Sequence, residues 1–276
     1  MRLEFAKMHG LGNDFVVVDA SRRAFALSAA QISALADRRT GVGFDQLLVV
    51  EPASSKAAHL RYRIFNADGG EVEHCGNGAR CFARFVRERG IASHQPLVVE
   101  TQNGLISVEA LEDHNYRVDM GVPELEPVRI PLLVSGRCAT YSLTIDADDY
   151  QFAAVSMGNP HAVLCVENVD TAPVTTLGPR IETHGLFPER VNVGFMQLCA
   201  RGELRVRVWE RGVGETRACG TGACAAVVAA RLQDLVDADV QVQLTGGTLL
   251  IHWPGEGQRL TMSGPTARVF DGSIEI

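Results

Sequence analysis

Two cysteines lie in closely similar surroundings, far apart in the chain. Cys75 begins the sequence CGNGA and Cys219 begins CGTGA. An apolar, alanine-rich stretch follows each one and predicts a helix, so both thiols are expected at helix N-termini. Unpaired N–H donors and the helix dipole stabilise a thiolate there and lower its pKa from about 8.5. The glycines let backbone N–H groups approach an anion closely. The sequence therefore predicts two reactive thiols, each beside an anion-binding loop.

Such a pair suits stereoinversion at a carbon next to a carboxylate. If a pseudo-twofold axis relates the two helix ends, one thiolate removes the proton from one face of the carbon. The opposite thiol then delivers a proton to the other face. The developing enediolate charge would lie on the carboxylate, where the helix ends and backbone donors stabilise it. The expected chemistry is thus cofactor-independent racemisation or epimerisation.

The two cysteines belong to a longer internal repeat. The offset between them is 144 residues (219 − 75), and other landmarks recur in the same order at similar offsets. The matching pairs are Glu71 with Glu215, Arg63 with Arg207, Gly12-Asn13 with Gly158-Asn159, and Gly43-Phe44-x-Gln46 with Gly194-Phe195-x-Gln197. Together they indicate a duplication, because any one of them alone would be weak.

The elements around the thiols follow from the residue pattern. Arg61–Phe65 and Leu204–Trp209 alternate apolar and polar residues and are expected to be strands. Helices are expected from about 77 to 89, with Gly90 just beyond the C-terminus, and from about 221 to 235. Leu3–Val18 and many shorter segments are strand-like. Many strands and few helices predict an α+β fold, with a boundary near Met120, where two prolines follow.

Composition excludes several classes of protein. Hydrophobic residues are 46% and charged residues 21%, which is ordinary for a globular chain. The net charge of −7 argues against nucleic-acid or membrane partners. No apolar run is long enough to cross a membrane, and the first residues lack the apolar region of a secretory signal, so a cytoplasmic protein is expected.

The cysteine and lysine counts limit the chemistry further. Seven cysteines without a CxxC motif favour neither a disulfide framework nor a metal site. A lysine-bound cofactor would have to use Lys7 or Lys56, the only lysines present. No metal and no cofactor are therefore expected. The remaining cysteines are expected to fill small spaces in the core: Cys81, Cys138, Cys165, Cys199 and Cys224.

Four ordered motifs resemble those of the diaminopimelate epimerase family, and the resemblance spans almost the whole chain. The motifs are HGLGNDFVVVD (9–19), NADGGEVEHCGNGARCFARFV (66–86), SMGNPHAV (156–163) and ERGVGETRACGTGACA (210–225). The resemblance implies two pseudo-symmetric α+β domains, each a mixed or antiparallel sheet curled around a central helix. The domains would be 1–118, with a returning C-terminal strand at 263–276, and 119–262.

The resemblance also implies an activity. Members of this family interconvert LL- and meso-diaminopimelate without a cofactor, in bacterial lysine and peptidoglycan synthesis. By motif, Cys75 and Cys219 match the acid/base pair, and His161 and Glu210 match residues that assist the cysteines. The sequence does not say which cysteine each one assists. The implied substrate-binding residues are Asn13, Gln46, Asn66, Gly76, Asn77, Asn159, Asn192, Glu210, Arg211, Gly220 and Thr221.

The resemblance further implies a homodimer. Phe270 stands where many members carry a tyrosine at the dimer contact. Within the substrate site, Arg211 suits a second carboxylate, because its planar guanidinium binds that group through two hydrogen bonds.

Three other readings remain open from the residues. A proline-racemase-like enzyme would also use two cysteines, although a small cyclic substrate would not need Arg211 and so many amides. Gly220-x-Gly222-x-x-Ala225 formally fits a dinucleotide fingerprint but has no strand immediately before it. A thiol-based redox or binding protein is the third alternative, and turnover without an electron acceptor would exclude it.

Overall fold

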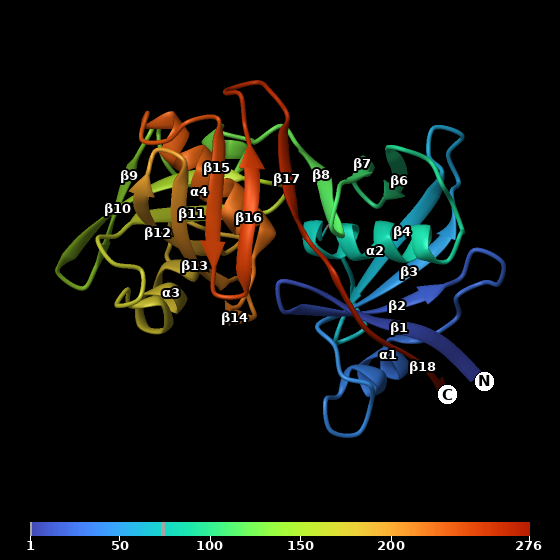
Figure 1. The fold of residues 1–276 in the computed structure, drawn as a ribbon. Helices are drawn as coiled ribbons and strands as arrows, with labels where there is room; N and C mark the ends of the chain where they lie inside the picture. Colours follow the sequence, from blue (N-terminus) through green and yellow to red (C-terminus); the bar gives the residue numbers. More distant parts are fainter. Residues whose placement is uncertain (1, 73–74) are drawn as a thin grey trace. The chain divides into compact units, whose positions relative to one another are not determined.

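The computed structural model describes residues 2–72 and 75–276 (Figure 1). The chain divides into two compact units. The first comprises Met1–Asp119 with Ser263–Ile276, and the second comprises Met120–Met262. As functional domains, the divisions proposed from the sequence, 1–118 with 263–276 and 119–262, stay a prediction.

The first unit is built mainly of strands with one long helix, α2. Its elements are β1 (Arg2–Gly10), β2 (Asn13–Asp19), α1 (Ala29–Ala36), β3 (Gln46–Pro52), β4 (Leu60–Asn66), β5 (Glu71–Val72), α2 (Gly76–Glu88), β6 (Leu97–Thr101), β7 (Gly104–Ala110), β8 (Asn115–Gly121) and β18 (Ala267–Glu275). The sheet is mixed, since β2 pairs with β3 in parallel and β3 with β4 antiparallel. The strand β18 returns to pair with β1.

The helix α2 packs against β1, β2, β3 and β7, so it lies at the centre of the first unit. Its residues Phe82, Phe85 and Val86 are buried. Gly90, with a φ of 64°, follows the helix as expected for a residue that ends it in the left-handed conformation.

The second unit repeats this plan around the helix α4. Its elements are η1 (a 3₁₀ turn, Pro127–Arg129), β9 (Tyr141–Ile145), β10 (Asp148–Ser156), β11 (Pro160–Cys165), α3 (Val174–Glu182), β12 (Asn192–Ala200), β13 (Glu203–Glu210), β14 (Gly214–Thr216), α4 (Gly220–Leu232), β15 (Asp239–Leu244), β16 (Gly247–His252) and β17 (Leu260–Pro265). The helix α4 packs against β10 to β13, β15 and β16 and is almost wholly buried.

The strand pairings of the two units correspond. The parallel pair β2–β3 corresponds to β11–β12, and the parallel pair β4–β6 corresponds to β13–β15. The same ion pair also joins equivalent strands. Arg63 Nε donates to Glu71 at 2.8 Å, and Arg207 Nε donates to Glu215 at 2.7 Å. The internal duplication is therefore visible in backbone pairing and in side-chain contacts.

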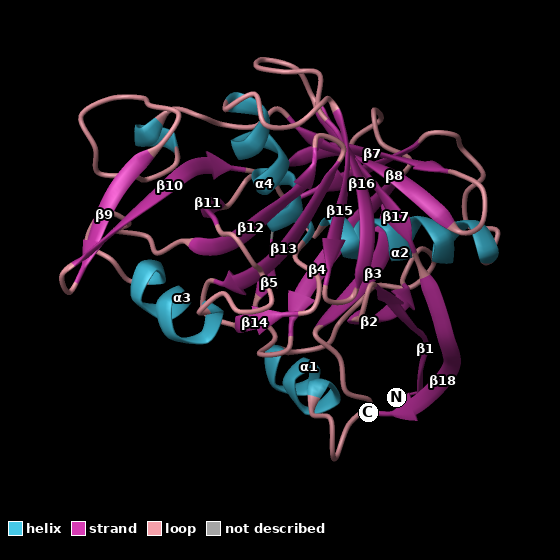
Figure 2. Cartoon of the chain, turned by 60° about the vertical axis from the view of Figure 1, so that its left-hand side comes forward, coloured by secondary structure: helices cyan, strands magenta, loops and turns pink. Residues whose placement is uncertain are grey.

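The expected fold class, α+β, is confirmed, and strands predominate over helices in both units (Figure 2). Leu3–Val18 is not one strand but the hairpin β1–β2, because Leu11 and Gly12 adopt positive φ and reverse the chain. The short helices α1 and α3 were not expected. Both helices that follow the cysteines were expected, although α4 ends at Leu232 rather than near residue 235.

The expectation for the other cysteines is wrong in part. Cys81 and Cys224 are buried inside α2 and α4, as expected. Cys138, Cys165 and Cys199 are exposed, so they fill no core space. Cys165 and Cys199 lie at the ends of β11 and β12, which are buried along most of their length and exposed at these ends.

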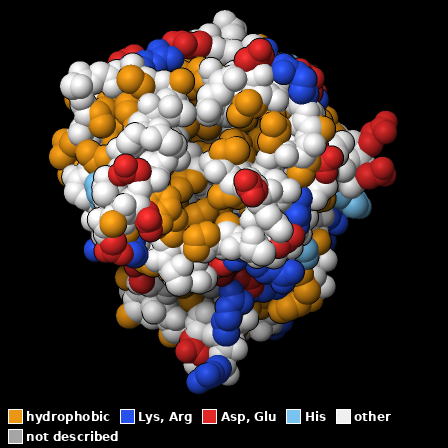
Figure 3. Space-filling model, turned by 90° about the vertical axis from the view of Figure 1, so that its left-hand side faces the viewer, with side chains coloured by type: hydrophobic (Ala, Val, Ile, Leu, Met, Phe, Trp, Pro, Cys, Tyr) orange, Lys and Arg blue, Asp and Glu red, His pale blue; other side chains and the backbone are white. Residues whose placement is uncertain are grey.

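Figure 3 shows one face of the molecule, on which hydrophobic side chains form separate patches among charged ones. Large exposed hydrophobic side chains occur in both units, Val128 being 84% and Val269 56% exposed. Single exposed residues of this kind are normal on proteins. No helix within residues 2–72 and 75–276 is both long and apolar enough to span a membrane.

Candidate active site

Cys75 is the N-cap residue of α2. Its backbone is extended, and its Sγ accepts a hydrogen bond from the backbone N–H of Gly78 at 3.3 Å. The Tyr62 hydroxyl donates to the Cys75 carbonyl at 3.3 Å. A Cβ on Gly78 would lie only 2.3 Å from that hydroxyl, so glycine is required for the close approach. The sulfur is thus held over the first turn of the helix, beside the N-terminal backbone of Gly76.

The side chain of Asn13 faces this thiol from the β1–β2 hairpin. Its Oδ1 lies 3.9 Å from Cys75 Sγ and accepts from Asn77 Nδ2 at 3.4 Å. Its Nδ2 donates to Asp45 Oδ2 at 2.9 Å. Three of the predicted site residues, Asn13, Cys75 and Asn77, therefore meet in the first unit.

Gln46 and Asn66 form a second polar pair in the same unit. They are opposite each other on β3 and β4, and Gln46 Nε2 donates to Asn66 Oδ1 at 2.9 Å. The other amide atom of Gln46, Oε1, is buried and has no hydrogen-bond partner among the residues described. An unpaired buried acceptor is costly, so this oxygen suits an N–H donor of a ligand.

Cys219 is the N-cap residue of α4 and is only 4% exposed. Its Sγ lies 3.6 Å from Thr221 Oγ1. Burial, together with the negative charge of Glu210, raises the pKa of the Cys219 thiol well above its usual value. Glu210 in turn accepts a short hydrogen bond from the Thr216 hydroxyl. The Gly220 backbone begins the helix beside the thiol.

His161 lies in the same unit and is completely buried. Burial and the nearby charge of Arg211 lower its pKa to about 3, so the imidazole is neutral at physiological pH. Its Nε2 lies 3.1 Å from Asn159 Oδ1, which can only accept, so Nε2 carries the hydrogen. The other nitrogen, Nδ1, is a buried acceptor without a partner in the described part of the chain.

A chain of contacts links this histidine to the second thiol. Asn159 Nδ2 donates to Thr221 Oγ1 at 3.3 Å, and Thr221 contacts Cys219. Of the two residues expected to assist the cysteines, Glu210 therefore acts directly on Cys219, whereas His161 is linked to that thiol only through Asn159 and Thr221.

Asn192 holds the turn that carries Arg211. Its Nδ2 donates to the Pro160 carbonyl at 2.8 Å, and its Oδ1 accepts from the Arg211 N–H at 2.9 Å. The guanidinium of Arg211 is exposed and donates to the Glu189 carbonyl at 2.9 Å. Both ends of the Asn192 amide are therefore engaged inside the protein, whereas most of the Arg211 fork is open to solvent.

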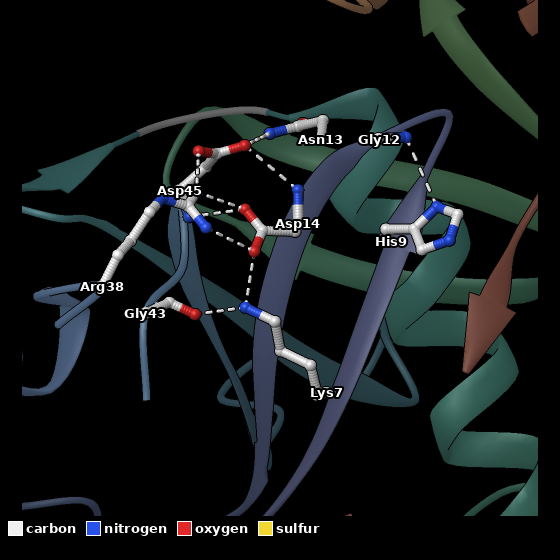
Figure 4. A network of polar contacts seen from close by, with 8 residues as sticks. All are labelled: Lys7, His9, Gly12, Asn13, Asp14, Arg38, Gly43 and Asp45. Atoms are coloured by element: carbon white, nitrogen blue, oxygen red, sulfur yellow. Dashed lines mark hydrogen bonds and ion pairs between the residues drawn. The ribbon is translucent and has the colours of Figure 1, made fainter. Parts of the chain in front are cut away.

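Four charged residues beside Asn13 were not singled out from the sequence. They are Lys7, Asp14, Arg38 and Asp45, and they form one network (Figure 4). A signal was present in the repeat: Asp45 lies between Phe44 and Gln46, whereas apolar Met196 stands at the matching position. A charge that only one copy carries indicates a function particular to that copy.

The two half-sites each offer what proton transfer requires: a thiol at a helix start, polar groups that orient it and backbone donors for an anion. No group of three or more His, Cys, Asp or Glu side chains arranged to hold a metal occurs within residues 2–72 and 75–276. The geometry fits acid/base chemistry on a small anionic molecule.

Two proteins with similar sequences carry the same name. A protein named diaminopimelate epimerase from Thioalkalivibrio sulfidiphilus is 56% identical, with both chains covered in full. A protein of the same name from Chromobacterium violaceum is 54% identical, again over both full lengths. Among solved structures, a hydroxyproline epimerase from Agrobacterium vitis has a TM-score of 0.71 and 16% identity, covering 99% of this chain and 92% of its own. That likeness shows the fold alone.

The profile of the family described as diaminopimelate epimerase matches residues 5–126 and 153–269. The matched ranges contain both cysteines and all the site residues discussed above. The chain belongs to the diaminopimelate epimerase family.

Proposed function

We propose that this protein is an isomerase that interconverts LL- and meso-diaminopimelate, with Cys75 and Cys219 as its two acid/base groups. The observation that carries the proposal is the pair of thiols at the N-caps of α2 and α4, in equivalent positions of two repeats. Membership of the family supports the substrate, and the pathways served would be lysine and peptidoglycan synthesis.

The reaction needs one thiolate and one thiol at its start. Cys219 is buried beside Glu210, which favours its neutral thiol form. Cys75 is more exposed and lies at a helix N-terminus, which favours a thiolate. In one direction Cys75 therefore removes the α-proton and Cys219 supplies a proton to the opposite face. In the reverse direction the two exchange roles, and the total number of protons on the pair is unchanged.

The carbanion formed in this way has its charge on the α-carboxylate. Backbone N–H groups at the start of each helix, from Gly76 and Asn77 in one unit and Gly220 and Thr221 in the other, are the donors expected to stabilise it. Such preorganised donors replace a cofactor as the electron sink in this proposal.

His161 and Glu210 would adjust the protonation of the second thiol. The neutral imidazole has a free lone pair at Nδ1, and the carboxylate of Glu210 favours retention of the proton on Cys219. Recognition of the substrate would fall to the amides Asn13, Gln46, Asn66, Asn159 and Asn192 and to Arg211. The unpaired oxygen of Gln46 suits an ammonium group, and the guanidinium of Arg211 suits a carboxylate.

A homodimer is part of the proposal. Val269 and Phe270 on β18 are 56% and 47% exposed, next to Phe5, whose ring centroid lies 6.1 Å from that of Phe270. An exposed aromatic and aliphatic pair on one strand suits a contact between copies. Sedimentation should give a dimer, and Phe270→Asp should shift it towards monomer; an unchanged dimer would place the contact elsewhere.

The direct test uses purified protein in a reducing buffer. Incubation with LL-diaminopimelate should give the meso isomer, measured by chiral chromatography, and incubation with meso should give LL. The equilibrium should be reached without added metal, nicotinamide or pyridoxal phosphate. Failure of the metal-stripped, cofactor-free protein to turn over, with recovery on adding one of these, would contradict the proposal.

A further inference from the structure

Asp45 determines which end of the Asn13 amide faces the thiol. An ionised carboxylate can only accept hydrogen bonds, so the amide group that faces Asp45 must be the NH₂. Asn13 Nδ2 is indeed 2.9 Å from Asp45 Oδ2. The carbonyl oxygen of Asn13 is then turned to the other side, towards Cys75 Sγ and Asn77 Nδ2.

Asp45 is itself held on several sides (Figure 4). Its backbone N–H donates to Asp14 Oδ1 at 3.1 Å, and its Oδ2 accepts from the Asp14 backbone at 3.1 Å. Arg38 donates to Asp45 at 2.7 Å and to both oxygens of Asp14 at 2.7 and 3.0 Å. The Asp45 carboxylate is therefore fixed before any ligand arrives.

Lys7 on β1 is the fourth member of the network. It is 9% exposed, forms an ion pair with Asp14 at 2.5 Å and donates to the Gly43 carbonyl. Burial alone would raise the pKa of Asp14, but hydrogen bonds from Arg38 and Lys7, with their charges, keep it far below its usual value, so Asp14 stays ionised. A fully paired network of this kind has one arrangement rather than several.

The second unit orients its asparagine the opposite way. Met196 stands at the position of Asp45, and no carboxylate contact to Asn159 occurs among the described residues. Asn159 Nδ2 donates to Thr221 Oγ1, which contacts the second thiol, and Asn159 Oδ1 lies on the other side, 3.1 Å from His161 Nε2. One repeat thus presents an amide acceptor towards its thiol side, and the other presents an amide donor.

We propose that Asp45, clamped by Arg38 and Asp14, is a positioning residue that keeps the Asn13 carbonyl directed at Cys75. This inference rests on the proposed function, in which Cys75 is one of the two acid/base groups. The Asn13 oxygen accepts from the S–H when Cys75 is protonated, and it accepts no proton itself. Loss of Asp45 frees the amide to turn its NH₂ group towards the sulfur, which stabilises the thiolate instead.

The experiment is a double-mutant cycle between Asp45→Asn and Asn13→Ala. Asp45→Asn is isosteric but can donate as well as accept, so it no longer fixes the amide. We expect it to lower kcat/KM for LL-diaminopimelate about 5–30-fold in the wild-type background. This is the size of effect expected when one buried hydrogen bond is lost. In the Asn13→Ala background the same change should alter kcat/KM by less than about twofold, because there is no amide left to position.

A second measurement does not depend on turnover. The rate of alkylation of Cys75 by iodoacetamide, followed by mass spectrometry of its peptide, reports the fraction of thiolate as the pH is varied. At pH values below the midpoint of the Cys75 titration, Asp45→Asn should increase the alkylation rate in the presence of Asn13. The increase should be about threefold larger than the one caused by the same substitution in Asn13→Ala. Removing the Asp45 charge acts directly on the thiol in both backgrounds, so the difference between them isolates the orientation of the amide.

The other ionisable groups around Cys75 are unchanged throughout this cycle. Among residues 2–72 and 75–276 these groups include Tyr62 on β4 and Arg80 and Cys81 on α2. Lys7 and Arg38, which pair with Asp14, also stay unchanged in Asp45→Asn and Asn13→Ala. The matched control is Asp170→Asn, which breaks an exposed carboxylate–arginine pair with Arg205 in the second unit. It should leave both kcat/KM and Cys75 alkylation within about 1.5-fold of wild type.

Arg38→Gln is the second variant, chosen because Arg38 is 57% exposed and its replacement should preserve folding. It should lower kcat/KM about 2–5-fold, again only when Asn13 is present. Equal effects of Asp45→Asn with and without Asn13, in both turnover and alkylation, would overturn the proposal. If the wild type does not act on diaminopimelate, the proposed function fails, but the alkylation cycle still decides the role of Asp45.

Discussion

The two repeats share a backbone and differ in their charges. Each places a cysteine at the N-cap of a buried helix, and each has the arginine–glutamate pair between equivalent strands. The asparagines Asn13 and Asn159 are shared as well, but other polar side chains around the thiols are not. Asn66 in the first unit lies at the position of Glu210 in the second, Asp45 at that of Met196, and Arg80 at that of Cys224. Duplication therefore supplies two equivalent thiol positions, and substitution makes their surroundings unequal.

This inequality has a chemical use. An enzyme that inverts a carbon needs an acid and a base of similar kind, because each must take the other's role in the reverse reaction. A substrate with two different ends needs an asymmetric site to fix which carbon reacts. Under the proposed function the helix starts would meet the first requirement, and residues such as Arg211, opposite Ala67 in the repeat, would meet the second.

The largest expected effect tests the shared part of the comparison. Cys75→Ala and Cys219→Ala should each reduce epimerisation by about 10²–10⁴-fold or more, because each thiol serves one face of the carbon. Cys81→Ala and Cys224→Ala, which remove the buried thiols within the same helices, should retain turnover and lose only stability. The rates of all four variants are measured by chiral chromatography. Wild-type turnover in either Cys75→Ala or Cys219→Ala would contradict the proposal that both N-cap thiols are required.

The second largest expected effect concerns Arg211, a side chain that only the second repeat carries. Arg211→Lys should lower kcat/KM about 10–100-fold, because an ammonium group cannot reproduce the planar fork that binds a carboxylate. For the same reason L-lysine, which lacks the second carboxylate, should be racemised as much as about 10⁴-fold more slowly than LL-diaminopimelate. Arg217→Lys, in the same unit, is the control. Turnover of L-lysine at a rate comparable to that of LL-diaminopimelate would show that Arg211 does not bind the second carboxylate of the substrate.

The residue pattern revealed the repeat but not the contacts that distinguish its copies. Both helices after the cysteines could be predicted, because glycine-rich starts and apolar periodicity are local signals. The hydrogen bond between Asn13 and Asp45 could not be predicted. The two residues are 32 positions apart in the chain and meet only because β2 and β3 pair in parallel. The exposure of Cys138, Cys165 and Cys199 could not be predicted either, because residue type does not show that Cys138 lies in a loop and that Cys165 and Cys199 lie at the exposed ends of strands.

The role of His161 predicts a difference in acid stability. Its pKa is about 3 in the folded protein and about 6.5 when unfolded, so between these values only the unfolded state binds the proton. The free energy of unfolding should therefore fall by about 1.4 kcal/mol per pH unit as the pH drops from about 6.5 towards 3. Denaturant unfolding at several pH values should show a smaller loss in His161→Gln than in wild type, most clearly above about pH 5, where the carboxylates remain ionised in both states.

The exposed His252 supplies the matched control for that measurement, since its side chain is 45% exposed. His252→Gln should keep the acid-dependent loss of stability seen in wild type. If His161→Gln keeps the full loss as well, His161 is not held neutral by the fold, and the second half-site lacks the buried acceptor assigned to it.

The smallest effect compares the glycines three residues after each cysteine. A Cβ on Gly78 would lie 2.3 Å from the hydroxyl of Tyr62, which is fully buried, but at an ordinary 3.5 Å from Cys75 Sγ. A Cβ on Gly222 would lie 2.8 Å from a Val208 methyl and 3.2 Å from Cys219 Sγ. The first clash is with a packed ring, and the second is with a methyl group and the thiol itself.

Gly78→Ala should therefore cost about 1–3 kcal/mol of stability through overpacking. If a shift of the Tyr62 side chain does not relieve the clash fully, the helix α2 must move. Gly222→Ala should cost less stability, because alanine gains up to about 1 kcal/mol of helix propensity and the valine can shift. It should nevertheless reduce turnover more than Gly78→Ala does, because the displaced atom is the Cys219 sulfur. Denaturant midpoints and kcat measured on both variants should thus rank them in opposite orders. The same order in both measurements would mean that the two thiols are equally sensitive to the packing beneath them, and that the half-sites differ only in their charges.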